Sequence, residues 1–112
     1  MDDVVVEQVL RAVEQVPRGR VVSYGDLAAL VGVGPRLVGR IMGTYGSNVT
    51  WWRVTNASGD LPVQLMDEVR ERWAAEGILL KPSGRGCRIA EYRADLARLD
   101  TDYERAISDL RG

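Results

Sequence analysis

The stretch that decides the fold runs from Ser23 to Val31 and reads SYGDLAALV. Ser23 and Asp26 have the spacing of a capping box, in which a serine hydroxyl caps the first turn of a helix and the side chain three residues later reaches back. We therefore predict a helix that begins after Ser23, ends near Val31 and buries Leu27, Ala28 and either Leu30 or Val31. Because the capping box fixes where this helix begins, the neighbouring segments can be placed from it.

A second short helix is predicted from Pro35 to Met42, directly after the first. Gly32 and Gly34 form a tight turn between the two helices, and proline is favoured at the first helical position. The second helix leaves Arg36 and Arg40, four residues apart, on one outer face. Two short helices joined by a glycine turn, with basic residues outside the second, are typical of a helix-turn-helix. The alternative is that the two arginines only keep an outer surface soluble.

Three further helices are predicted from hydrophobic residues that recur every three or four positions. They are expected at residues 3–16, 62–76 and 91–110. Pro17 ends the first of them. Trp73 lies on the apolar stripe of the second, so we assign it to the core. The third must bury its stripe against the rest of the chain or against another chain.

Short extended segments are predicted at residues 20–22 and 53–56. Residues 78–89 contain a loop rich in glycine between two apolar stretches, which is typical of a β-hairpin or a small wing. The two arginines of this wing, Arg85 and Arg88, would contact a phosphate backbone or lie in water.

Together these elements predict a single, mostly α domain in a chain of 112 residues. Its fold class is a winged helix-turn-helix-like DNA-binding domain with a small β-hairpin and an extra C-terminal helix. We assign residues 1–90 to the winged helix DNA-binding domain and residues 91–112 to a C-terminal amphipathic helical extension. The composition, 46% hydrophobic and 28% charged, is that of an ordinary globular protein.

The chain contains one cysteine, Cys87, and no histidine. Structural zinc sites, Ser-His-Asp triads and Cys-His dyads need residues that it lacks, and no cluster of carboxylates has the spacing of magnesium ligands. We therefore expect no metal and no cofactor. No apolar run approaches the roughly 20 residues that span a bilayer, and the acidic start lacks the basic region of a secretory signal. A cytoplasmic, nucleoid-associated location without membrane contact is expected.

Positive charge is concentrated around the helix-turn-helix. Between Arg18 and Arg53 five arginines oppose one acid, Asp26, which gives +4, whereas the segment from Glu91 to the end carries −2. The planar guanidinium group, with its several donors, suits contacts to phosphates and bases. The central part of the chain is therefore a candidate for nucleic-acid binding, although the net charge of the whole chain is −1.

Two adjacent tryptophans follow the helix-turn-helix, in the segment Val49–Val54. Neighbouring side chains point in different directions along a strand or an irregular segment, so Trp51 and Trp52 cannot both face one core. At least one of them should line a surface or a pocket. The alternative is that one tryptophan packs inside and the other merely covers a patch.

The segments Pro17–Ala28 and Arg36–Met42 together resemble the DNA-binding domain of the O6-alkylguanine-DNA alkyltransferases. That family has a Pro-Cys-His-Arg-Val active-site motif downstream, and Thr50–Val54, with the sequence TWWRV, takes its place here. The chain is most similar to the alkyltransferase-like branch, in which tryptophan commonly replaces the reactive cysteine. The resemblance covers roughly residues 3–80. It departs from the family's motif at Thr50, in place of the proline, and at Trp52, in place of the histidine.

The resemblance implies roles for individual residues. Arg36 matches an arginine that enters the base stack in place of a flipped guanine, while the recognition helix lies in the minor groove. Trp51 matches the acceptor cysteine at the floor of the pocket, and Glu76 matches an acid of the catalytic relay. The implied DNA-binding residues are Tyr24, Arg36, Arg40 and Arg53. The implied lesion pocket consists of Tyr24, Trp51, Trp52, Val54 and Asn56.

The resemblance implies a sensor of DNA damage rather than an enzyme. Such a protein, expected to be a monomer, binds double-stranded DNA that contains O6-alkylguanine by base flipping in the minor groove, and flags the lesion for nucleotide excision repair proteins. No residue would be catalytic, because tryptophan cannot accept the alkyl group. One alternative is a winged-helix DNA-binding or regulatory module without a lesion pocket. Further alternatives are an enzyme that uses Cys87 as the alkyl acceptor and a protein-interaction module built on the C-terminal helix.

Overall fold

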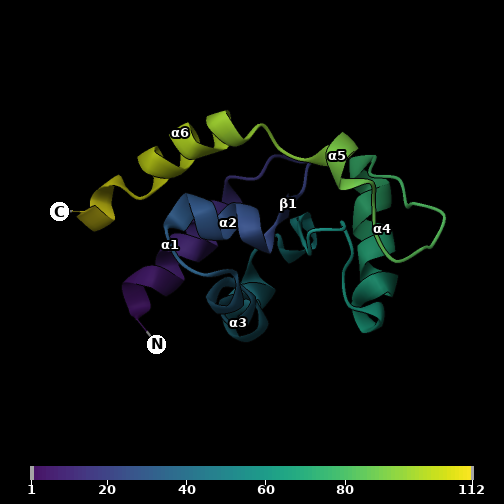
Figure 1. Ribbon diagram of the computed structural model, residues 1–112, viewed down its shortest axis with the longest axis horizontal. Helices are drawn as coiled ribbons and strands as arrows, with labels where there is room; N and C mark the ends of the chain where they lie inside the picture. Colours follow the sequence, from purple (N-terminus) through teal and green to yellow (C-terminus); the bar gives the residue numbers. More distant parts are fainter. Residues whose placement is uncertain (1, 112) are drawn as a thin grey trace.

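The structure, a computed structural model, describes residues 2–111 and is mostly helical (Figure 1). Its α-helices are α1 (Asp3–Glu14), α2 (Tyr24–Val31), α3 (Pro35–Tyr45), α4 (Met66–Glu76), α5 (Ile89–Tyr92) and α6 (Leu96–Ala106). Its 3-10 helices are η1 (Gly46–Asn48), η2 (Trp51–Arg53), η3 (Val63–Leu65) and η4 (Ser108–Arg111). Its strands are β1 (Val22–Ser23) and β2 (Val54–Thr55). In Figure 1, α3 and α6 lie on opposite sides of α1 and α2, and α4 lies to the right.

The capping box at the start of α2 is present as predicted. The Asp26 N–H donates to Ser23 Oγ at 3.0 Å, and the Ser23 N–H donates to Asp26 Oδ2 at 2.9 Å. Gly32 ends α2 in the left-handed region, at φ 87°, and Pro35 begins α3. The predicted helix pair is therefore confirmed, with a second helix that is longer than expected and ends at Tyr45.

Two hydrophobic clusters hold the helices together. The first joins α1, α2, α3 and α6, and its fully buried side chains include Leu27 and Ile41. The second lies under α4 around the fully buried Trp73, which confirms the predicted core position of this tryptophan. Val22 belongs to the first cluster and Val21 to the second, because successive side chains of an extended segment point to opposite sides. Full burial of a valine, leucine or isoleucine side chain stabilises the fold by about 1.5–3 kcal/mol.

The two-stranded sheet is parallel, and it joins distant parts of the chain. Val22 in β1 pairs with Val54 in β2. On the other side, the Val21 N–H donates to the Tyr92 carbonyl and the Ala94 N–H donates to the Val21 carbonyl, both at 2.9 Å. The chain that enters α2 is therefore held between the tryptophan segment and the C-terminal part.

The predicted wing at residues 78–89 is present as a loop with a single bridge rather than as two regular strands. Leu80 and Cys87 form an antiparallel bridge. Pro82 has no N–H to continue the ladder beyond it. Gly86 bridges Asp60 instead, so the wing is attached to the turn that follows β2.

The single helix predicted for residues 91–110 is wrong, because the structure breaks it in two. α5 ends at Tyr92, and Asp95 caps α6 by accepting hydrogen bonds from the backbone of Ala97 and Arg98, both at 3.1 Å. The pairing with Val21 keeps the intervening residues extended. The periodicity of apolar residues did not reveal this long-range contact.

α6 packs against α1 and shares its core. Leu99, Tyr103 and Ile107 belong to the first hydrophobic cluster. At the far end, Arg11 of α1 pairs with Asp109 at 2.5 Å. The segment that we predict as a C-terminal extension is thus part of the same packed body. Within residues 2–111 no helix is long and apolar enough to cross a lipid bilayer.

Candidate nucleic-acid interface

The outer face of α3 carries two arginines without partners. Arg36 and Arg40 are exposed, and neither makes a hydrogen bond or an ion pair with any of residues 2–111. α3 contains no acidic residue in its first turn, and its N-cap residue, Gly34, offers no side-chain cap to the first backbone N–H groups. Unpaired guanidinium groups and an uncapped helix N-terminus both attract phosphate. This face is therefore suited to a phosphate backbone.

A cavity of about 370 Å³ lies beside the start of α2. Its lining residues are Tyr24, Asn56, Asp60, Leu61, Pro62, Val63 and Arg85. The volume falls in the range of about 300–1,000 Å³ that is common for small-ligand sites. Burial raises the pKa of the Tyr24 phenol, so at neutral pH its hydroxyl is uncharged and can both donate and accept a hydrogen bond. The cavity brings together two of the predicted pocket residues, Tyr24 and Asn56.

Asn56 shapes the cavity wall through the turn that follows β2. Its Oδ1 accepts hydrogen bonds from the N–H groups of Ser58 and Asp60, each at 2.9 Å. Gly59 completes the turn at φ 84°, and a Cβ atom there would lie 2.2 Å from the carbonyl oxygen of Cys87. Only glycine fits both this backbone conformation and this close approach. The turn and the wing are therefore packed directly against each other.

Trp52 anchors the tryptophan segment to α4. Its Nε1–H donates to Glu76 Oε2 at 2.7 Å, and its carbonyl accepts from the Trp73 Nε1–H at 2.8 Å. The Arg72 guanidinium lies 4.4 Å from the centroid of its ring. Trp51 meets Trp52 edge-on, with 5.8 Å between the ring centroids and 84° between the planes. Trp52, which the resemblance assigns to the lesion pocket, thus holds η2 against α4.

Glu76 is the acceptor at the centre of this anchor. Arg53 donates to its carboxylate from Nε at 3.0 Å and from Nη2 at 2.9 Å, and the Gly19 N–H donates at 2.8 Å. Arg53 Nη1 donates to the Val16 carbonyl at 3.0 Å. The side chains of Arg53 and Glu76 are only 14% and 4% exposed. Burial opposes ionisation of Glu76, but the hydrogen bonds from Arg53, Gly19 and Trp52 outweigh it and lower its pKa.

Besides Arg36 and Arg40 on α3, four predicted site residues lie outside the cavity. Arg53, expected to contact DNA, is paired with Glu76, and only 14% of its side chain is exposed. Val54, expected in the pocket wall, is 1% exposed and belongs to the first hydrophobic cluster. Trp51 and Trp52 are half-buried against the second hydrophobic cluster and do not line the cavity.

Sequence reasoning missed most of the residues that do line the cavity. Leu61, Pro62 and Val63 come from the segment that follows the turn at Gly59. Arg85 comes from the wing, and no spacing in the sequence relates it to the start of α2. The glycines on both sides of it were the one signal of a close backbone approach.

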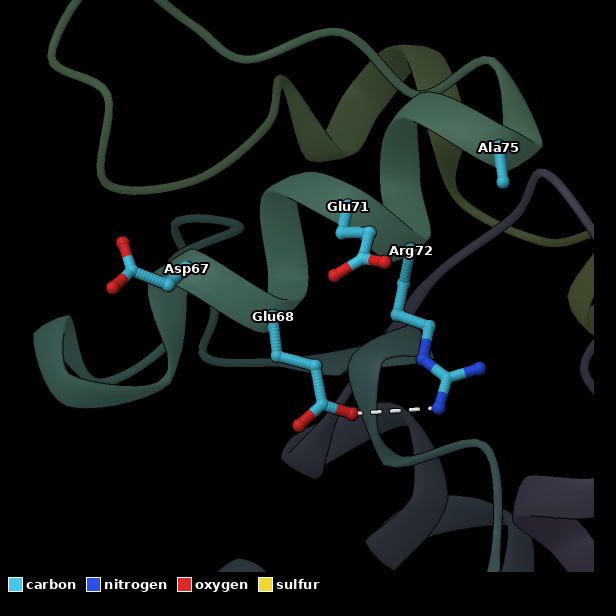
Figure 2. Close-up of a pocket in the computed structure, with 5 residues that line it drawn as sticks. All are labelled: Asp67, Glu68, Glu71, Arg72 and Ala75. Carbon is cyan, nitrogen blue, oxygen red and sulfur yellow. Dashed lines mark hydrogen bonds and ion pairs between the residues drawn. The ribbon is translucent and has the colours of Figure 1, made fainter.

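A larger hollow, of about 560 Å³, lies on the outer side of α4. Figure 2 shows Asp67, Glu68 and Glu71 around it, with Arg72 paired to Glu68 at 3.4 Å. Three acids against one arginine repel a phosphate backbone. The candidate interface is therefore the face that carries Tyr24 and α3, although its cavity is smaller.

Cys87 is not available as an acceptor of an alkyl group. Its side chain is fully buried in the second cluster. Burial raises the pKa of the Cys87 thiol to about 11. At neutral pH the thiol therefore stays protonated, whereas the thiolate is the nucleophilic form. This placement contradicts the alternative of an enzyme that uses Cys87.

Comparison with known proteins agrees with the resemblance seen in the sequence. Residues 5–78 match the family model described as 6-O-methylguanine DNA methyltransferase, DNA binding domain. A protein of Vibrio parahaemolyticus named DNA base-flipping protein is 32% identical over 91 residues, which are 76% of this chain and 90% of that protein. The DNA base-flipping protein of Escherichia coli is 34% identical over 90 residues, which are 74% of this chain and 69% of that protein.

Two solved structures from S. pombe have a similar fold. Atl1 in complex with damaged DNA containing O6-carboxymethylguanine aligns with a TM-score of 0.73 and 26% identity, over 85% of this chain and 98% of that chain. The S. pombe ATL in complex with DNA aligns with a TM-score of 0.69 and 27% identity, over the same shares. The chain therefore belongs to the family of the 6-O-methylguanine DNA methyltransferase DNA-binding domain, as a relative of its base-flipping, alkyltransferase-like members.

Proposed function

We propose that this protein binds O6-alkylguanine in double-stranded DNA by flipping the damaged base out of the duplex, without removing the alkyl group. One arrangement carries the proposal. Tyr24 is the first residue of α2 and also lines the cavity, so the helix-turn-helix and the cavity share a border. A duplex held in its minor groove by α3 would then present a flipped base to the cavity.

The arginines of α3 can compensate for the base that leaves the stack. Extrusion of a base costs a few kcal/mol. Arg36, exposed in the first turn of α3, can fill the vacated space, because a guanidinium group stacks and donates hydrogen bonds at once. Arg40, one turn further on, is free for a phosphate contact. The apolar side chains of Leu61 and Pro62 would face the flipped base in the cavity.

Among residues 2–111 no thiol lines the cavity, so it offers no counterpart of the family's acceptor cysteine. Trp51 occupies the acceptor position of the family's motif, and its indole has no lone pair suited to this transfer. Binding would therefore end in a stable complex with the lesion. The relatives named DNA base-flipping proteins support the flipping of a base out of the duplex. We propose further that the complex marks the lesion for nucleotide excision repair proteins, which remove a damaged segment instead of reversing its chemistry.

The test compares the affinity for two duplexes of one sequence, with and without O6-methylguanine, at one salt concentration. We expect the damaged duplex to bind about tenfold more tightly, which corresponds to about 1.4 kcal/mol. Arg36→Ala should bring the two affinities together. Arg98→Ala, which changes an exposed arginine on α6, should leave their ratio unchanged. Equal affinity of the unchanged protein for both duplexes would contradict the proposal and favour a DNA-binding module without a lesion pocket.

The same assay tests the pocket-floor role of Trp51, which rests on the resemblance alone. If Trp51 contacts the flipped base, Trp51→Ala lowers the affinity for the damaged duplex and spares the undamaged one. An equal loss for both duplexes would make Trp51 a packing residue of the second cluster.

A further inference from the structure

Arg85 places an unpaired positive charge at the cavity. Backbone contacts fix its position, because its carbonyl accepts from the Leu61 N–H at 3.3 Å and its neighbour Gly86 bridges Asp60. A Cβ atom at Gly86 would lie 2.2 Å from the carbonyl oxygen of Gly59, so the wing lies directly on the cavity wall. The Arg85 side chain makes no hydrogen bond or ion pair with any residue of the described range 2–111. Its donors are therefore available to a ligand.

The other charged residue of the lining, Asp60, is already neutralised. Lys81 Nζ lies 2.5 Å from Asp60 Oδ1 and also donates to the Ser58 carbonyl at 2.7 Å. The side chains of Asp60 and Lys81 are 28% and 22% exposed, so water screens this pair only in part. Because Lys81 neutralises the charge of Asp60, the positive charge of Arg85 has no counterpart in the lining. The cavity therefore favours an anionic group.

We propose that Arg85 gives the cavity a preference for O6-substituents that carry a carboxylate over neutral substituents of the same size. This inference rests on the function proposed above, because it requires the flipped base in the cavity. A guanidinium group binds a carboxylate through two parallel hydrogen bonds between opposite charges, roughly twice as strongly as a neutral pair binds. Arg85 lies outside residues 5–78 that match the family model.

The experiment measures binding to four duplexes of one sequence at neutral pH and fixed salt. One is undamaged, and the others contain O6-methylguanine, O6-carboxymethylguanine or O6-carbamoylmethylguanine. The carbamoylmethyl group has the shape of the carboxymethyl group without its charge. Arg85→Gln is compared with Arg88→Gln, because Arg88 is also an exposed arginine of the wing but lines a different hollow, beside Leu79 and Tyr92.

We expect the unchanged protein to bind the carboxymethyl duplex about tenfold more tightly than the carbamoylmethyl duplex. Arg85→Gln should bring this ratio to about one. Arg85→Lys should retain part of it, because lysine keeps the charge but not the paired donors. Arg88→Gln should retain all of it.

The inference is overturned if the unchanged protein shows no preference between the two duplexes, or if Arg85→Gln leaves the preference intact. A uniform loss of affinity for all four duplexes in Arg85→Gln would also overturn it, since this result assigns Arg85 to the phosphate backbone. Failure of the proposed function has a different signature. In that case the undamaged and O6-methylguanine duplexes bind equally to the unchanged protein. The inference is then overturned together with the proposed function.

Discussion

Arg53 and Arg40 show how differently this protein uses the same side chain. Arg53 belongs to a junction formed by Trp52, Arg53 and Glu76, where each of its guanidinium nitrogens has an acceptor and 14% of its side chain is exposed. Arg40 lies on the outer face of α3 and has no partner among residues 2–111. The junction stabilises the fold, whereas the charge of Arg40 is available to another molecule.

The difference arises from what lies opposite each arginine. Glu76, the partner of Arg53, is 23 residues away in the sequence. Asp26 is the single acid between Arg18 and Arg53, and it is engaged in the capping box of α2 and in an ion pair with Arg93 at 3.1 Å. No local acid therefore remains to neutralise α3. The arginines of α3 therefore remain available to a phosphate backbone.

The largest expected effect comes from breaking the junction with Arg53→Gln. This change leaves the buried Glu76 carboxylate without its cation, and loss of one partner of a buried pair costs about 3–5 kcal/mol. The measurement is the free energy of unfolding from a denaturant titration. A loss below about 1 kcal/mol would show that water or a second donor replaces Arg53, and would restore it as a candidate DNA contact.

Arg40→Gln is the matched change on α3. Its effect on the free energy of unfolding should stay within about 0.5 kcal/mol, because an exposed, unpaired side chain is removed. Its affinity for DNA should fall equally for damaged and undamaged duplexes, and the slope of log affinity against log salt should decrease by about one.

Trp52→Phe should destabilise the fold less than Arg53→Gln does. It keeps an aromatic ring but removes the N–H that donates a hydrogen bond to Glu76. A hydrogen bond to a charged group contributes about 1.5–3 kcal/mol. Trp51→Phe is the control, since the Trp51 indole makes no hydrogen bond within residues 2–111. Similar losses in the two variants would mean that ring volume, and not the contact with Glu76, makes Trp52 stabilising.

The parts of this protein that could be predicted are those that neighbouring residues determine. The capping box of Ser23 and Asp26 spans three positions, and so the start of α2 follows from the sequence. The contact between Trp52 and Glu76 spans 24 positions, and no local pattern encodes it. In the same way, Tyr24 and Asn56 were found through motifs that a family shares, whereas Arg85 reaches the cavity only because the wing packs on the turn at Gly59.

The smallest expected effect is the change in stability with pH that Glu76 causes, because stability changes for this reason only at acidic pH. The pKa of Glu76 lies below its ordinary value of 4.5. Below pH 4.5 the unfolded chain therefore binds a proton that the folded protein still excludes, so stability decreases as the pH falls. This contribution is complete above pH 4.5 and is lost as the pH falls through the folded pKa of Glu76.

Glu76→Gln tests this assignment, because glutamine binds no proton in this range. Its free energy of unfolding should start lower than that of the unchanged protein but decrease less steeply below pH 4.5. Asp109→Asn is the control, because the hydrogen bond from Arg11 also lowers the pKa of Asp109, but in an exposed position. Salt screens such a pair, so its removal should change the slope little. If Glu76→Gln and the unchanged protein have parallel pH profiles, the acid sensitivity lies outside the junction.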